Sequence, residues 1–114
     1  MSDAPIIPAN LTLPALQQHI RDMCAHMNWN GASREQLFLL FAEEVGELAK
    51  AIRNATNLGI EEGKQRDAVS VKANLAEEFA DVLSYLVDLA NKFDIDLDAA
   101  YRAKSEANLS RRWG

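Results

Sequence analysis

Four stretches of the chain repeat apolar residues every three or four positions, which is the spacing of one face of an α-helix. They run from about Leu13 to Met27, from just after Ser33 to about Ala55, from about Val71 to Phe93, and from the 94–98 turn to about Arg112. No stretch of useful length alternates apolar and polar residues as a half-buried strand does. The pattern therefore predicts an all-α fold of four helices.

The residues between these stretches carry start and stop signals for helices. Asn28 to Gly31 interrupts the first period, and Ser33 followed by Gln36 is a capping-box pattern for the second helix. Asp96 or Asp98 can cap the fourth helix. These signals place the boundaries of the helices without reference to any tertiary contact.

Two segments lack the helical period. Residues 1–12 contain two prolines, and we expect a flexible N-terminal arm there. Residues 56–70 are polar and contain two glycines, which predicts a flexible loop that acts as a lid or faces a partner. With 114 residues, the remainder suffices for one domain, which we place at 13–114.

Two pairs of carboxylates, Glu44 with Glu47 and Glu78 with Asp81, lie within the second and third helices at a spacing of three residues. Each pair therefore projects from one side of its helix. Glu44 lies in the centre of the apolar stripe of its helix, which consists of Leu37, Leu40, Phe41, Leu48 and Ala51. A carboxylate in such surroundings must be protonated, paired or bound to a metal.

The second pair is less central. Glu78 lies at the edge of the stripe of the third helix, formed by Leu75, Phe79, Val82, Leu86 and Phe93, and Asp81 lies outside it. We expect this pair at the mouth of a crevice. A solvated acidic helix face is the alternative for both pairs, but the apolar surroundings of Glu44 and the presence of two such pairs favour a metal site.

Composition narrows the class of protein. The net charge of −5 argues against binding to nucleic-acid polymers. The single Cys24 excludes an intramolecular disulfide and fits a reducing compartment, and its position in a stripe with Leu16, Ile20, Met23 and Met27 predicts a core residue. The N-terminus lacks the features of a secretion signal, and no apolar run has the length of a membrane span. We therefore expect a cytoplasmic protein that binds no membrane.

The ligand types favour particular ions. Carboxylates without histidine in either motif favour Mg²⁺, for which Mn²⁺ can substitute, over iron or zinc. Glu43 lies four residues before Glu47 and can serve as an extra ligand or as a base for water. His19 and His26 lack a third ligand, and we interpret them as surface or core residues.

A second group of polar residues suits phosphate. Tyr101, Lys104, Asn108 and Arg111 follow one another at helical spacing, and cations and amides on one stripe can bind phosphate oxygens, although such a stripe is also typical of a solvated face. Trp29 can stack on a base or anchor the hinge before the second helix. Tyr85 lies one turn beyond Asp81, where its hydroxyl can reach a ligand.

The sequence contains no phosphate-binding P-loop, no dinucleotide-binding turn and no nucleophile elbow. Because no residue stands out as a covalent nucleophile, water activated by a metal ion is the simplest mechanism.

These motifs resemble those of the MazG-like branch of the all-α nucleoside triphosphate pyrophosphatases. The family signature EExxE followed by ExxD is matched by residues 43–47 and 78–81. Residues 81–113 are similar to the third and fourth helices of the family and include Lys104 and Asn108. Trp29 matches a tryptophan of the deoxycytidine-triphosphatase-like members.

The resemblance implies a four-helix fold completed by dimerisation, as a homodimer or a dimer-of-dimers tetramer. It also implies hydrolysis of a nucleoside triphosphate to the monophosphate and pyrophosphate, through attack of water on the α-phosphate. Mg²⁺ would be bound by Glu44, Glu47, Glu78 and Asp81, and Glu43 would be a further ligand or orient the water. Two alternatives remain: a hydrolase of another diphosphate, such as an alarmone or a nucleotide sugar, or a non-catalytic helical dimerisation module.

Overall fold

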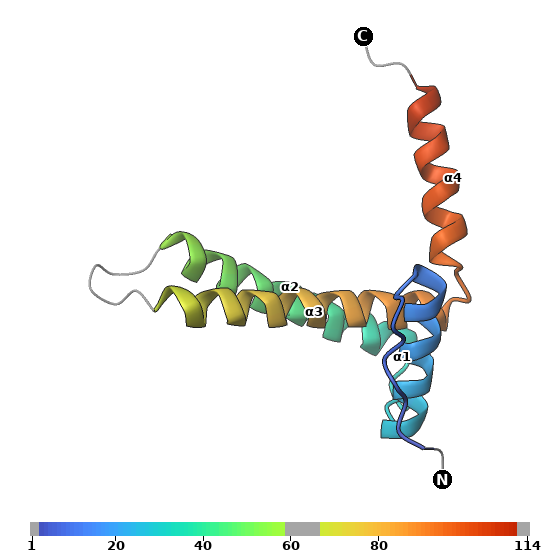
Figure 1. Cartoon of the computed structure of the whole chain (residues 1–114), viewed down its shortest axis with the longest axis horizontal. Helices are drawn as coiled ribbons and strands as arrows, with labels where there is room; N and C mark the ends of the chain where they lie inside the picture. The colour runs from blue at the N-terminus through green and yellow to red at the C-terminus, as the bar shows by residue number, and fades with distance from the viewer. Residues whose placement is uncertain (1–2, 59–66, 112–114) are drawn as a thin grey trace. The chain divides into compact units, whose positions relative to one another are not determined.

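The computed structural model describes residues 3–58 and 67–111 and contains four helices in these ranges (Figure 1). They are α1 (Leu13–Met27), α2 (Arg34–Thr56), α3 (Ala68–Lys92) and α4 (Leu97–Ser110). No described residue lies in a strand, so the prediction of an all-α fold is confirmed. Most of the loop predicted at 56–70 lies outside the described residues.

The helix starts follow from side chains that cap exposed backbone N–H groups. The Ser33 hydroxyl accepts from the backbone of Gln36 at 3.1 Å, and the Gln36 side chain accepts from the backbone of Ser33 at 2.8 Å. This is the predicted capping box. Of the two aspartates proposed for α4, Asp96 is the cap, accepting from Ala99 at 3.1 Å, whereas Asp98 pairs with Arg102.

Helix α3 begins three residues before the predicted start at Val71. The reason is Asp67, whose carboxylate accepts from both the backbone N–H and the hydroxyl of Ser70 at 3.1 Å. Those two hydrogen bonds lower the pKa of Asp67. An aspartate inside a polar segment thus acts as a helix cap that hydrophobic periodicity alone does not reveal.

Helix α4 ends at Ser110, two residues before the predicted end. The backbone N–H of Arg111 donates to the carbonyl of Asn108 at 3.2 Å, and the Ser110 hydroxyl donates to that of Ala107 at 2.9 Å. These bonds span three residues, so they tighten the last turn and end the helix. Arg111 has an extended backbone, and the helix does not set the direction of its side chain.

The chain divides into two compact units, and each is described separately. The first consists of residues up to 32 together with those from 87 onward. It comprises α1, the whole of α4 and the last turns of α3. Its core is formed by Ile20, Cys24 and Val87, with Leu16 and Leu97 packed against them. The prediction that Cys24 is a core residue is confirmed, whereas Met27 of the same stripe is exposed.

A buried pair of amides joins α1 to the turn between α3 and α4. The side-chain amide of Gln17 donates to the Asn91 side chain and to the carbonyl of Ile95, both at 2.8 Å. Asn91 donates back to the backbone carbonyl of Gln17 at 3.0 Å, and the backbone N–H of Leu97 donates to the Gln17 side-chain oxygen at 3.0 Å. Because each of these polar groups is paired, burying them costs little and fixes the register between the helices.

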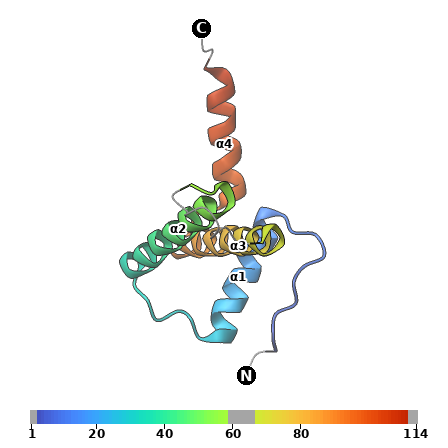
Figure 2. The same ribbon diagram turned by 90° about the vertical axis from the view of Figure 1, so that its left-hand side faces the viewer.

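The second unit, residues 33–86, consists of α2 and most of α3. The two helices run antiparallel and alongside each other in both views (Figures 1 and 2). Leu37 and Ala51 of the predicted α2 stripe are buried, but Leu40 is exposed, as are Phe79 and Leu86 of the α3 stripe. The expectation that these stripes are covered by a core is therefore only partly met, since one helix covers only one side of another.

Among the described helices, none is both long and apolar enough to cross a lipid bilayer.

Candidate metal centre

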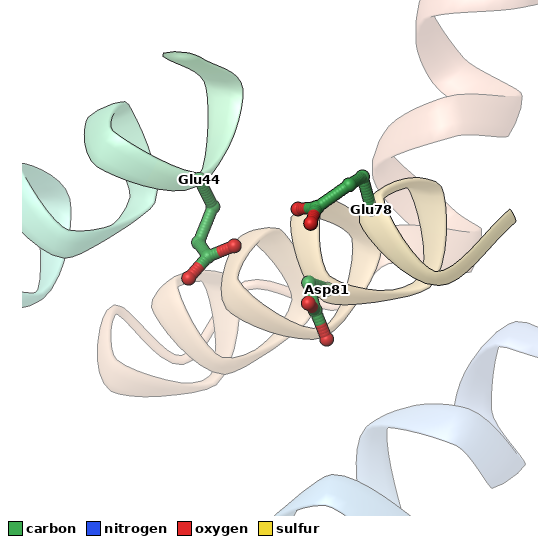
Figure 3. Close-up of side chains that lie close together, drawn as sticks. All are labelled: Glu44, Glu78 and Asp81. Atoms are coloured by element: carbon green, nitrogen blue, oxygen red, sulfur yellow. The ribbon is translucent and has the colours of Figure 1, made fainter. Parts of the chain in front are cut away.

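Three carboxylates of the second unit converge between its two helices. Glu44 extends from α2, and Glu78 and Asp81 extend from α3 (Figure 3). Each offers one oxygen, and these oxygens all lie within 4.8 Å of one another. The spacing of three residues places Glu78 and Asp81 on one side of α3, and the antiparallel packing brings that side to Glu44.

The burial of the three residues decreases from the helix interface outward. Glu44 and Glu78 are half-buried, and Asp81 is exposed. The exposure of Asp81 agrees with its predicted position outside the apolar stripe of α3. The Oε2 atom of Glu78 has no exposed surface and no hydrogen-bond partner among the described residues. A buried carboxylate oxygen without a donor is costly, so this atom calls for a cation or a proton.

The electrostatics of Glu44 reflect this crowding. Burial raises its pKa, and the charges of Asp81 and Glu78 raise it further, followed by those of Glu47 and Glu43. All of these effects raise the pKa of Glu44, because burial disfavours the ionised form and the neighbouring charges are all negative. A divalent cation would reverse the effect, since it favours the ionised form of each carboxylate.

Glu78 shows the same imbalance. Burial raises its pKa first, and the charges of Asp81, Glu47 and Glu77 add to the effect. With only carboxylate oxygens and no nitrogen or sulfur ligand, the set fits a hard divalent cation. The residues therefore fit the metal that the sequence motifs indicate.

The structure brings together three of the four predicted ligands. Glu47 is exposed and does not belong to the cluster, although its charge acts on both Glu44 and Glu78. Glu43 is also exposed. The roles of Glu43 and Glu47 remain predictions. His19 and His26 belong to no group with metal-ligand spacing in the described ranges.

The residues predicted to bind substrate lie on several elements. Tyr85 is half-buried on α3 in the second unit. Trp29, Lys104, Asn108 and Arg111 are exposed in the first unit, with Trp29 just after α1. Lys104 and Asn108 share a side of α4, as predicted, whereas Arg111 follows the helix.

Lys92 joins two polar side chains in the first unit, and sequence spacing signals only one of these contacts. Lys92 donates to Asp88 at 3.0 Å and to the side-chain oxygen of Asn30 at 2.7 Å. The spacing of four residues between Asp88 and Lys92 is a recognisable signal for an ion pair on a helix. The contact with Asn30, 62 residues away in sequence, carries no such signal.

Comparison with known proteins gives concordant matches. The model of the MazG nucleotide pyrophosphohydrolase domain matches residues 32–111. Over 101 residues, the chain is 33% identical to dCTP pyrophosphatase 1 of Rattus norvegicus and of Mus musculus, and 34% identical to dCTP pyrophosphatase 1 of Homo sapiens. Each alignment covers 88% of this chain and 58% of the relative, so the chain spans less than two thirds of the length of these relatives.

Proposed function

Because the chain belongs to the family of MazG nucleotide pyrophosphohydrolase domains, we propose that it hydrolyses a nucleoside triphosphate to the monophosphate and pyrophosphate. The observation that carries this proposal is the cluster of Glu44, Glu78 and Asp81 with its unpartnered buried oxygen. Triphosphates are bound in proteins together with divalent cations, for which carboxylates are suitable ligands. The arrangement of the cluster in space thus supports the activity in addition to sequence similarity.

We propose Mg²⁺ as the cofactor, with Mn²⁺ as a substitute, held by Glu44, Glu78 and Asp81 and by Glu47 as the fourth carboxylate. When bound, such an ion polarises a phosphoryl oxygen and lowers the pKa of a water molecule. The carboxylates repel one another and would also repel a triphosphate. A bound cation would reduce both repulsions, so the triphosphate would bind together with the metal.

The other predicted residues would orient the attacking water, accept its proton and bind the phosphate groups of the substrate. Glu43 adjoins Glu44 and is exposed, which suits a carboxylate that orients the attacking water and accepts its proton. The water oxygen bonds to the α-phosphorus while the bond from that phosphorus to the bridging oxygen breaks, and pyrophosphate leaves. Lys104, Asn108 and Arg111 would bind phosphate oxygens and neutralise charge on the leaving group.

We propose roles in substrate binding for two aromatic residues as well. We assign to Trp29 the stacking of the base, because more than half of its surface is exposed and an indole provides a broad apolar face. The Tyr85 hydroxyl would contact the substrate one turn beyond Asp81. The relatives named as dCTP pyrophosphatases make dCTP the first nucleotide to test.

The decisive experiment is incubation with a panel of nucleoside triphosphates, nucleotide sugars and an alarmone, with Mg²⁺ or with excess EDTA, followed by assay of pyrophosphate and orthophosphate. We expect pyrophosphate from a triphosphate, and no activity in EDTA. In ¹⁸O-labelled water, the label should appear in the monophosphate. Label in pyrophosphate, or release of orthophosphate from the triphosphate, would contradict attack at the α-phosphorus. Hydrolysis of another diphosphate alone would favour the alternative substrate class.

A further inference from the structure

The backbone that carries Trp29 is fixed at the end of α1. Asn28 adopts a left-handed conformation with φ of 59°, its N–H donates to the carbonyl of Ala25 at 3.4 Å, and the N–H of Trp29 donates to that of Cys24 at 2.8 Å. This pair of bonds is a Schellman motif, which ends the helix in a defined geometry. Although 56% of Trp29 is exposed, its backbone is therefore anchored.

The next residue is held from a different element. The ammonium group of Lys92 on α3 donates to the Asn30 side chain at 2.7 Å and to the Asp88 carboxylate at 3.0 Å. Only 13% of the Asp88 side chain and 27% of the Lys92 side chain are exposed. The bond between Lys92 and Asp88 is thus shielded in part from water, which fixes the ammonium group, whereas its charge-assisted bond to Asn30 is exposed.

The contact continues into the core of the first unit. Cys24 is buried, and burial followed by the charge of Asp88 raises the pKa of its thiol. Asp88 thus interacts with both Cys24 and Lys92. The carbonyl of Cys24 binds the backbone of Trp29, and Lys92 binds Asn30. All of these contacts lie within one compact unit, so they hold the loop whatever the position of the other unit.

We propose that Lys92, oriented by Asp88, is a positioning residue for Trp29: through Asn30 it holds the segment after α1 so that the indole is presented in one orientation to the base of the substrate. This inference rests on the proposed function, in which Trp29 stacks on the base. Lys92 itself would not contact the nucleotide. The benefit is pre-organisation, because an aromatic side chain on a fixed backbone loses less conformational entropy on binding.

The test uses Trp113→Phe as the background, since Trp29 is then the only tryptophan in the chain. Asn30→Ala removes the contact but preserves the Lys92–Asp88 pair, so the fold is retained. Lys92→Met removes both contacts, Lys92→Arg can restore them, and Lys72→Met removes an exposed lysine elsewhere on α3. Acrylamide quenching of Trp29 fluorescence is measured without nucleotide, and kcat and KM are measured with the preferred triphosphate.

We expect Asn30→Ala and Lys92→Met each to increase quenching and to raise KM by about tenfold, equivalent to about 1.4 kcal/mol, with kcat nearly unchanged. Combining Asn30→Ala with Lys92→Met should give the same quenching and the same KM as Lys92→Met alone. Lys92→Arg should restore both readouts, and Lys72→Met should alter neither.

Unchanged quenching in Asn30→Ala and Lys92→Met would overturn the inference, as would increased quenching with an unchanged KM. A parent protein that hydrolyses no nucleotide would instead overturn the proposed function, and the quenching data would still decide whether Lys92 orders Trp29.

Discussion

At the scale of single residues, the acidic cluster is arranged against the stability of the metal-free protein. Glu44, Glu78 and Asp81 bring like charges together, and the pKa values of Glu44 and Glu78, the partly buried members, are raised. Such a conflict between local stability and charge is typical of functional sites. It also makes the effect of neutral substitutions predictable in sign.

Replacing Glu78 by Gln should stabilise the metal-free protein and reduce its activity. The amide retains the shape of the side chain but removes one negative charge from the cluster. We expect urea unfolding without Mg²⁺ to show a larger free energy of unfolding, and kcat/KM to fall by more than about tenfold, or ~1.4 kcal/mol. Glu77→Gln, which removes the same charge from an exposed neighbour, is the control. Equal activity of the two variants would contradict a ligand role for Glu78.

The raised pKa values of Glu44 and Glu78 predict how stability depends on pH. The folded protein binds protons at these sites more tightly than the unfolded chain does. The stabilising effect of this proton binding is therefore fully present at a pH below 4.5, the ordinary pKa of glutamate. It is lost as the pH rises through the raised values. In EDTA, the free energy of unfolding of the parent should therefore decrease as the pH rises above 4.5. The decrease should be steeper than in a Glu44→Gln, Glu78→Gln double variant, which lacks both titrating groups.

Saturating Mg²⁺ should remove that difference in slope, because the ion favours the ionised carboxylates. Asp67 has a lowered pKa and acts in the opposite direction, but its contribution is lost only as the pH falls below its ordinary value of 3.8. The two effects therefore occupy separate pH ranges. Identical slopes for the parent and the double variant in EDTA would refute the assignment.

At the scale of helices, capping groups determine where each element begins. Ser33 and Gln36 satisfy each other's backbone N–H groups at the start of α2, the helix that carries Glu44. The Asp67 carboxylate accepts from the backbone N–H of Ser70 at the start of α3, which carries Glu78 and Asp81. The caps therefore fix the first residue of each of the two helices that carry the acidic cluster.

Ser33→Ala should lower the free energy of unfolding by about 1 kcal/mol, because it leaves a backbone N–H of the first turn without its acceptor. Chemical denaturation with circular dichroism measures the change. Ser84→Ala is the matched control: its hydroxyl donates only to the carbonyl of Ala80 within α3, and alanine favours the helix, so stability should be unchanged or slightly higher. A larger loss from Ser84→Ala would contradict this account.

At the scale of the whole molecule, both helices of the second unit expose apolar side chains. Phe38, Val45 and Ile52 follow one another at intervals of seven residues on α2 and are 54%, 42% and 43% exposed. On α3, Phe79, Leu83 and Leu86 are similarly exposed at helical spacing. Patches of this kind mark interaction surfaces, so we expect a second copy of the chain to cover them, as the family resemblance implies.

Sedimentation at micromolar concentration should therefore show at least a dimer. Val45→Glu should shift the protein towards the monomer, because it would bury a charge in the interface. Leu39→Glu introduces the same charge on the same helix but on a different side, at a residue that is 65% exposed, and should leave association unchanged. A parent protein that is monomeric and fully active would contradict the dimer.

The sequence by itself determined the helical class, the helix containing each acidic motif and the predicted capping box, because periodicity and capping depend on residues three or four positions apart. It also indicated the conflict at Glu44. Only the tertiary structure decided that Glu44, Glu78 and Asp81 meet while Glu47 stays outside, and that Lys92 reaches Asn30. Those contacts join residues far apart in the chain, and which of them form depends on how the helices pack, which no local spacing encodes.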